Sequence, residues 1–323
     1  MNDHLLNYMP PDGREIYIMV DYVEFLCLIN KEISLDSVIG YIYKNPENES
    51  EIYTGNKEHP DANLYEGEMK DRERNNATQW FEHTKIRKNY FGQVYPFDFK
   101  DELLSLNESL DESNILYIFL LLCANLRNLN KKKRYNYTDN FELLSLDALK
   151  IYLPGFNVEH FGKSSVSKDF PSKLSDAILD LAIKICEQPL EKNILEIKPN
   201  DTGDFGLDIV AWRRPAEKDR APGGLICFVQ CTCSSSKWVE KQHDSHPDKW
   251  RSCFDFVHFP ANIMFIPFCY RNSDDKWVER RHVRSILMDR FRICLLFNNS
   301  NLQNAAFFPY IDKIVNDFIS NNA

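Results

Sequence analysis

The sequence GDFGLDIVAW at positions 203–212, followed about twenty residues later by FVQCTC at 228–233, decides the fold of this chain. Both runs are rich in β-branched and aromatic residues and follow turn-forming residues, so we expect two successive strands. Asp208 opens the first strand and Gln230 ends the second. Carboxylate and amide oxygens are hard ligands that suit Mg²⁺. The pair therefore indicates a metal site of the kind that assists phosphodiester hydrolysis.

The composition is that of an ordinary globular protein. Of the 323 residues, 43% are hydrophobic and 27% charged, with only 11 Gly and 15 Pro, which excludes a disordered or collagenous chain. We expect two domains, a recognition or partner-binding region at 1–108 and a domain with the Asp208–Gln230 pair at 109–323. The net charge of −9 argues against a general basic coat for nucleic acid, but it permits a local basic groove.

Cysteine usage and hydropathy favour a cytoplasmic protein with no membrane segment. The nine cysteines have no regular spacing, and no signal-peptide pattern follows Met1. We therefore expect reduced thiols in a cytoplasm. The longest apolar run, 115–124, is much shorter than the roughly 20 residues of a membrane-spanning helix, so it predicts a buried core helix.

Hydrophobic periodicity and turn-forming residues divide the rest of the chain into elements. The basic run at 131–134 is expected to be a loop, and Glu142 to lie in the first turn of the helix after it. The other expectations are short strands within 14–44, a loop or surface insert at 45–76, helices at 138–152 and after Pro171, strands at 194–197, 207–212 and 225–233, a short helix at 236–243, a strand at 262–267 and a long basic helix beginning near Lys276.

The order helix, three strands, helix, strand resembles the PD-(D/E)xK nuclease superfamily, over roughly residues 110–297. Three motifs carry the resemblance: Phe141-Glu142, the Asp-x-Gly-x-Asp pattern at 204–208, and Val-Gln-Cys at 229–231. Within the superfamily the chain looks most like Mrr-type restriction endonucleases and related effector nucleases of bacterial antiphage defence. The resemblance implies an α/β fold with a restriction-endonuclease-like core, that is, a mixed central sheet flanked by helices, and an α+β N-terminal domain.

The resemblance also implies roles for individual residues. Asp208 would be the metal ligand and Glu142 would assist it, while Gln230 stands where a glutamate is more common. The Gln230 side-chain oxygen and the Cys231 carbonyl are neutral ligands that complete a shell for Mg²⁺ or Mn²⁺ without further repulsion. Asp208 and Gln230 are thus expected to serve catalysis as well as metal binding.

The chain departs from the family at Thr232, where a lysine usually orients the attacking water. Lys237 and Lys241 follow shortly afterwards, at the start of the next expected helix. Either lysine could reach back into the site as a replacement. Lys241 is preferred, because Trp238 one turn earlier can anchor that helix and fix its direction.

The function implied by the resemblance is metal-dependent endonucleolytic cleavage of DNA by a defence effector. Such nucleases commonly act with an ATPase, a helicase or a sensor protein, and many form homodimers. This chain has no Gly-x-x-x-x-Gly-Lys-Ser/Thr loop, so a nucleotide-driven step would come from a partner. Two groups of basic residues are candidates for phosphate contact, namely Lys131, Lys132, Lys133 and Arg134, and Arg280, Arg281 and Arg284.

Other interpretations remain open at this level. Asp208 can belong to an ordinary turn, Glu142 can interact with a helix dipole, and the basic side chains can be solvated. A noncatalytic scaffold on a nuclease-like fold fits the missing lysine and the acidic net charge. A zinc site could draw on Cys231, Cys233, His243, His246 and Cys253, although their spacing is irregular. The sequence does not separate DNA from RNA as the substrate.

Overall fold

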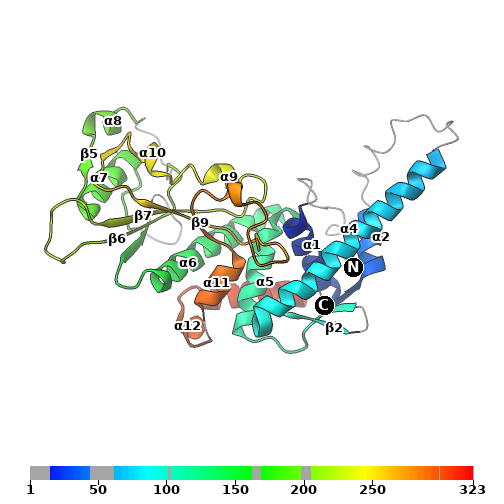
Figure 1. Ribbon diagram of the computed structural model, residues 1–323. Helices are drawn as coiled ribbons and strands as arrows, with labels where there is room; N and C mark the ends of the chain where they lie inside the picture. Colours follow the sequence, from blue (N-terminus) through cyan, green and yellow to red (C-terminus); the bar gives the residue numbers. More distant parts are fainter. Residues whose placement is uncertain are drawn as a thin grey trace. The chain divides into compact units, whose positions relative to one another are not determined.

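A computed structural model describes residues 15–43, 62–100, 103–161, 169–197, 205–297 and 299–322 (Figure 1). The fold is α/β, and the chain divides into two compact units. The first comprises Met1–Arg134, Phe268–Val278 and Tyr310–Ala323, and the second comprises Tyr135–Pro267 and Glu279–Pro309. The boundary expected after residue 108 lies inside the first unit.

The second unit is built on a five-stranded mixed sheet with the strand order β10-β9-β7-β6-β4. Strands β4, β6 and β7 pair antiparallel, whereas β7, β9 and β10 pair parallel. The expected α/β class with a mixed central sheet is therefore confirmed. The strands are β4 (Asn157–His160), β6 (Ile209–Arg213), β7 (Leu225–Cys231), β9 (Ala261–Phe265) and β10 (Ile286–Met288).

Helices flank this sheet, with α6 (Arg134–Tyr152) and α7 (Leu174–Ile185) the longest among the described helices of the unit (Figure 1). The apolar residues predicted on one face of α7 are all buried, and they pack with Val210 of β6 and Phe228 of β7. Shorter elements complete the unit: β5 (Gln188–Pro189), α8 (Glu191–Leu195), α9 (Trp238–Lys241), α10 (Pro247–Trp250), β8 (Phe254–Asp255), α11 (Arg290–Leu296) and α12 (Asn299–Asn304).

Two predictions for the second unit are wrong. The strand expected at 194–197 is replaced by α8, whose Ile194 is fully buried. The long basic helix expected from Lys276 does not form. Residues Arg280–His282 form a single 3-10 turn, and the apolar run Ile286–Met288 becomes the edge strand β10 because it pairs with β9. A new helix, α11, then begins where the Asp289 side chain accepts a hydrogen bond from the Arg292 amide.

The first unit combines a small antiparallel sheet with helices, as expected for an α+β region. The sheet order is β1-β3-β2, formed by β1 (Glu32–Ser34), β2 (Phe97–Lys100) and β3 (Leu103–Leu106). The helices are α1 (Ile16–Asn30), α2 (Leu35–Tyr43), α4 (Ala62–Phe91), α5 (Glu112–Ala124) and most of α13 (Phe308–Asn321). The prediction of a buried helix at α5 is confirmed, and no helix in the described ranges has an apolar stretch long enough to cross a membrane.

Two further predictions fail in the first unit. The strands expected within 14–44 are mainly α1 and α2, and only β1 is extended. The β-branched and aromatic residues of α1 reflect burial on all sides of that helix rather than a strand. Residues 62–76, expected in a loop or insert, form the first half of α4, while 45–61 lie outside the described residues. The pattern that indicates this helix was missed. It lies in the second half of α4, where buried side chains recur every three or four residues from Ala77 to Phe91.

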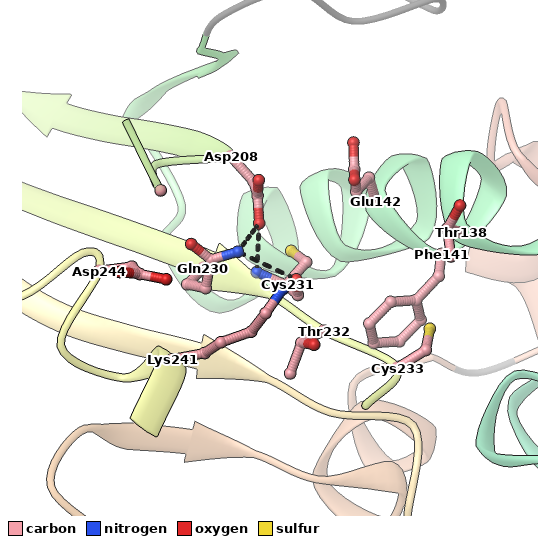
Figure 2. A pocket seen from close by; sticks show the side chains of 11 residues that line it. Thr138, Phe141, Glu142, Asp208, Gln230, Cys231, Thr232, Cys233, Lys241 and Asp244 are labelled. Atoms are coloured by element: carbon pink, nitrogen blue, oxygen red, sulfur yellow. Dashed lines mark hydrogen bonds between the residues drawn. The ribbon is translucent and has the colours of Figure 1, made fainter. Parts of the chain in front are cut away.

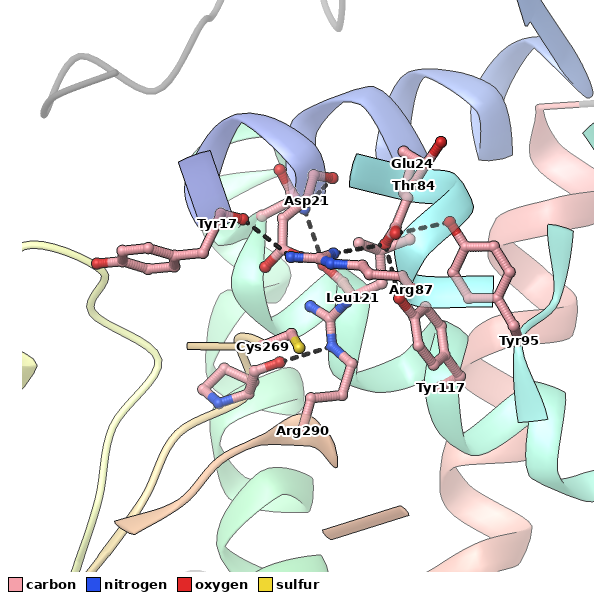
Figure 3. A network of polar contacts seen from close by, with 12 residues as sticks. Tyr17, Asp21, Glu24, Thr84, Arg87, Tyr95, Tyr117, Leu121, Cys269 and Arg290 are labelled. Carbon is pink, nitrogen blue, oxygen red and sulfur yellow. Dashed lines mark hydrogen bonds and ion pairs between the residues drawn. The ribbon is translucent and has the colours of Figure 1, made fainter. Parts of the chain in front are cut away.

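A buried ionic network joins α1, α4 and α5 (Figure 3). The Arg87 guanidinium, which is fully buried, donates to Asp21 Oδ1 at 2.5 Å and to Glu24 Oε2 at 3.0 Å. Glu24 also accepts hydrogen bonds of 2.8 Å from the hydroxyls of Tyr95 and Tyr117. Buried charges are tolerated only when they are paired in this way, so the network fixes how these helices meet.

Replacing Arg87 with methionine should destabilise the first unit strongly. The substitution leaves the Asp21 and Glu24 carboxylates buried without their cation, which costs about 3–5 kcal/mol. The matched control is Lys85→Met on the same helix, where an exposed Lys85–Glu82 pair is lost at a cost below about 0.5 kcal/mol. Urea denaturation of both variants measures the difference, and equal losses would contradict a stabilising role for the network.

Unfolding should also depend on His83, which is buried near Arg87. Burial, with repulsion from Arg87 as the second cause, lowers the pKa of His83 from 6.5 to about 4. Between these pH values the unfolded chain binds the proton more tightly, so this contribution to stability is complete above about pH 6.5 and is lost as the pH falls toward 4. Urea midpoints at the two ends of this window should therefore differ less for His83→Gln than for the wild type.

Candidate functional site

A pocket of about 360 Å³ opens in the second unit where β6 begins and β7 ends (Figure 2). The register pairs Ile209 of β6 with Val229 of β7, which places Asp208 opposite Gln230. The pocket brings together side chains that are far apart in the sequence. Its lining comprises Thr138, Phe141, Glu142, Gly206, Asp208, Gln230, Cys231, Thr232, Cys233, Lys241 and Asp244.

Asp208 is held rigidly by hydrogen bonds. Its side chain is largely buried, and Oδ2 accepts bonds of 2.6 Å from both the Gln230 side-chain amide and the Cys231 backbone amide. Its own backbone pairs on both sides, with Val229 and with Phe161. Asp208 thus lies inside the pocket, two residues after the turn at Phe205 and Gly206.

Gln230 presents two different faces to its surroundings. Its nitrogen lies between two oxygens, 2.6 Å from Asp208 Oδ2 and 3.1 Å from the Cys231 carbonyl. Its oxygen, Oε1, is buried and has no hydrogen-bond partner among the described residues. A buried acceptor without a partner is costly, so this oxygen is available for a ligand.

The Cys231 thiol is poorly suited to nucleophilic or zinc chemistry. Burial, reinforced by the nearby Asp208 and Glu142 carboxylates, raises the pKa of Cys231 well above its usual value. A thiol with a raised pKa is a weak nucleophile, because nucleophilic attack requires the thiolate. In the described parts of the chain, no three His, Cys, Asp or Glu side chains are grouped so that they could hold a metal ion, so the alternative zinc set is not assembled.

Glu142 lines the pocket, but its place in α6 differs from the prediction. The helix begins at Arg134, so Glu142 lies in its middle rather than in its first turn. An interaction with the positive end of the helix dipole, which fades beyond the first turn, therefore does not explain this residue. In Figure 2 its carboxylate projects from α6 on the Asp208 side of the pocket.

The two candidate lysines are placed differently. Lys241 lines the pocket and extends from α9 toward Asp208 and Cys231, and its ammonium has no hydrogen bond or salt bridge to any described residue (Figure 2). Lys237, the residue before α9, is exposed and does not line the pocket. Trp238, the first residue of α9, is buried and fixes the position of this helix. Thr232 itself is buried, and its hydroxyl accepts a hydrogen bond from the Ser234 amide.

Asp244 is a pocket residue that the sequence reading missed. It follows Lys241 by one turn, as the hydrogen bond from the Asp244 amide to the Lys241 carbonyl shows. This three-residue spacing from Lys241 is the sequence feature that could have predicted its place in the pocket. Lys249 holds the Asp244 carboxylate at 3.3 Å and donates to the Phe205 carbonyl at 2.7 Å. Asp204, the first residue of the Asp-x-Gly-x-Asp pattern, lies outside the described residues.

The basic residues expected to contact nucleic acid belong to different units. Lys131, Lys132 and Lys133 are exposed in the first unit and form a 3-10 turn rather than a loop, and Arg134 donates to the Leu129 and Arg127 carbonyls. Arg280, Arg281 and Arg284 are exposed in the second unit, which also contains the pocket. Arg290, farther along the segment expected to form a basic helix, is fully buried and donates to the Pro267 carbonyl.

Substituting Gly206 should damage the pocket more than an equivalent change elsewhere. Gly206 has φ +77°, and an added Cβ would lie 2.9 Å from Asp244 Cγ. The matched control is Gly155→Ala, since Gly155 has φ +82° but its added Cβ would approach only the flexible Arg213 side chain at 3.6 Å. We expect about 1 kcal/mol of destabilisation at Gly155 from backbone strain and about 1–3 kcal/mol more at Gly206. Equal urea midpoints for the two variants would contradict the close approach.

Comparison of the chain with protein-family models, with curated proteins and with solved structures found no match. The geometry of the pocket is therefore the basis on which a function can be assigned.

Proposed function

We propose that the protein is a Mg²⁺- or Mn²⁺-dependent endonuclease that hydrolyses phosphodiester bonds of DNA. One observation carries the proposal: Asp208 and Gln230 meet in a pocket that also contains Glu142 and the Lys241 ammonium. Two carboxylates, an amide and an amine in one concave site suit binding of a divalent cation together with an anionic substrate. The antiparallel β4-β6-β7 strands followed by the parallel β9 and β10 are consistent with a restriction-endonuclease-like core.

The Gln230 amide provides a test of whether a metal ion fits. Its nitrogen contacts Asp208 Oδ2 and the Cys231 carbonyl, so two oxygens converge on one amide nitrogen. A half-turn of the amide exchanges its nitrogen and oxygen with little change of shape. Three oxygens then face one another, an arrangement that is unfavourable unless a cation lies among them. The residues present therefore fit a divalent metal ion, with Glu142 as the additional carboxylate.

Each residue then has a defined chemical role. Asp208, Gln230, the Cys231 carbonyl and Glu142 would hold the metal ion, which lowers the pKa of bound water and neutralises charge on the phosphate. Lys241 would donate a hydrogen bond to a phosphate oxygen or to the attacking water. The positive charge of the site would then come from α9, because Thr232, at the position where the family usually has lysine, carries no charge. Burial of Asp208 and Gln230 keeps the ligand oxygens away from bulk water, which strengthens both interactions.

The biological setting proposed for this activity is bacterial antiphage defence in the cytoplasm. The protein would be the effector, and an ATPase, a helicase or a sensor protein would release its activity. The chain has no phosphate-binding Gly-x-x-x-x-Gly-Lys-Ser/Thr loop, which supports a separate source for any nucleotide-driven step. A homodimer would supply the two sites needed to cut both strands of a duplex.

Plasmid cleavage with Mg²⁺ or Mn²⁺, in the presence of the activating partner if one is required, tests the site. Asp208→Asn should abolish cleavage because a neutral amide replaces the anionic ligand. Lys241→Ala should slow it about 10²–10³-fold through loss of transition-state stabilisation. Lys218→Ala, which removes the same charge from the exposed loop at the opposite end of β6 and β7, should change the rate less than about twofold. Equal rates for the wild type and all three variants would rule out the site.

A second candidate, a noncatalytic nuclease-fold module, is favoured by two observations. The Asp208 carboxylate is already satisfied by donors from Gln230 and Cys231, and Thr232 occupies the usual place of the lysine. Isothermal titration with Mn²⁺ separates the two candidates. Binding that disappears in Asp208→Asn supports the endonuclease, whereas absence of binding with and without DNA supports the noncatalytic module.

A further inference from the structure

Two segments next to the pocket carry an excess of positive charge. Residues 237–243 and 279–285 together contain five Lys and Arg side chains against two Glu, in a chain whose net charge is −9. We call these two segments the basic surface. Both belong to the second unit, and Lys241 of the first segment lines the pocket. In Figure 1 the 279–285 segment runs beside α9.

The side chain of Gln242 joins the two segments. It is fully buried, and its nitrogen donates to the His282 carbonyl at 2.8 Å. Its oxygen accepts from the Arg284 backbone amide and the Ser285 hydroxyl, both at 2.8 Å. A neighbouring strand would bond the carbonyl of one residue and the amide of the residue two positions later. The Gln242 side chain bonds the His282 carbonyl and the Arg284 amide in the same way, so it takes the place of a peptide group. An amide side chain supplies both a donor and an acceptor, as a peptide group does.

The backbone of Gln242 is itself anchored to the central sheet. Asn262 of β9 donates from its side chain to the Gln242 carbonyl at 2.9 Å. The Asn262 side-chain oxygen in turn accepts from the Ser245 hydroxyl at 2.8 Å. The sheet, the end of α9 and the 279–285 segment therefore form one connected hydrogen-bonded structure. The 279–285 segment is held in place although it contains only a single helical turn.

Most cations of the basic surface form no ion pair with a described residue. Arg281 does pair with Glu279, through two bonds of 3.1 and 3.2 Å, and it lowers the pKa of Glu279 to about 2. Arg280, Arg284 and Lys237 are exposed, and their charged groups make no hydrogen bond or salt bridge to any described residue. If ion pairs within the surface stabilised it, most of these cations would contact an acidic side chain. These three exposed cations are therefore able to bind an external anion.

We infer that Gln242 is a positioning residue that holds the 279–285 segment against α9, so that Arg280, Arg284 and Lys237 bind phosphates of duplex DNA beside the pocket. The choice of ligand rests on the proposed function. An extended row of phosphates matches separate, unpaired cations on two segments better than a single small anion does. Because such contacts read no bases, binding through this surface is independent of sequence.

Fluorescence anisotropy with a short labelled duplex, in EDTA so that cleavage does not interfere, tests the inference on the full chain. Each lost phosphate contact lowers the slope of log K against log salt by about 0.9. Arg280→Gln/Arg284→Gln should therefore lower the slope by about 2. The matched control is Lys218→Gln/Arg220→Gln, which removes two exposed charges from the loop at the opposite end of β6 and β7. It should leave the slope unchanged.

Gln242→Ala tests the positioning role, because it alters no charge. If Gln242 sets the geometry of the surface, the slope should fall by about 1 and affinity by about tenfold. A lower thermal midpoint with an unchanged slope would show a purely structural residue and overturn the inference. Should this variant fail to fold, the paired arginine variant still decides, since equal slopes for it, the loop control and the wild type overturn the inference.

The inference and the proposed function fail in different ways. Slopes that depend on Arg280 and Arg284, with no plasmid cleavage under any metal or partner condition, would uphold the binding surface and overturn the endonuclease. Metal-dependent cleavage that is lost in Asp208→Asn, with slopes unaffected by the arginine variants, would uphold the endonuclease and overturn the binding surface.

Discussion

Antiparallel pairing of β6 with β7 is the constraint on which the rest of the pocket depends. The register places Asp208 opposite Gln230, and the backbone of Cys231 then supplies a second donor to the same carboxylate oxygen. A shift of one residue would turn these side chains to the other face of the sheet. Core packing of Val210 and Phe228 against α7 opposes such a shift, so the hydrophobic core fixes the polar site.

The electrostatic character of the pocket differs from that of the whole chain. Asp208, Glu142 and Asp244 bring negative charge to its lining, and Lys241 is the basic side chain among the lining residues. An acidic centre favours a cation, and a basic surface favours an anion. The overall charge of −9 therefore says little about either property, because both are set within a few elements of the second unit.

The sequence alone could predict the parts of the fold where local pattern and tertiary environment agree. The apolar face of α7 and the strand at β9 are such cases. Prediction failed where tertiary burial removed the pattern, as in α1, which is buried on every side and has no polar face to reveal a helix. It also failed at the 279–285 segment, where charge suggested a helix but pairing of Ile286–Met288 with β9 decided the structure.

The same limit applies to the candidate site. Asp208 and Gln230 could be identified because one strand pair brings them together, and the preference for Lys241 over Lys237 followed from the anchoring role of Trp238. The position of Glu142 within α6 could not be fixed, because the helix starts at Arg134, four residues before the expected start at 138. Asp244 and Gln242 were missed since their roles depend on contacts with Gly206 and with the 279–285 segment.

Placing the amine on α9 rather than on β7 means that two different elements support the two parts of the proposed site. A lysine at position 232 would be fixed by the same strand that carries Gln230, whereas Lys241 belongs to a four-residue helix. Gln242, the next residue, connects that helix to a surface suited to phosphates. In the proposed site, the amine and the surface would therefore share one support, because Gln242 bonds both to β9 and to the 279–285 segment, and phosphates bound at the surface would bear on the position of the amine.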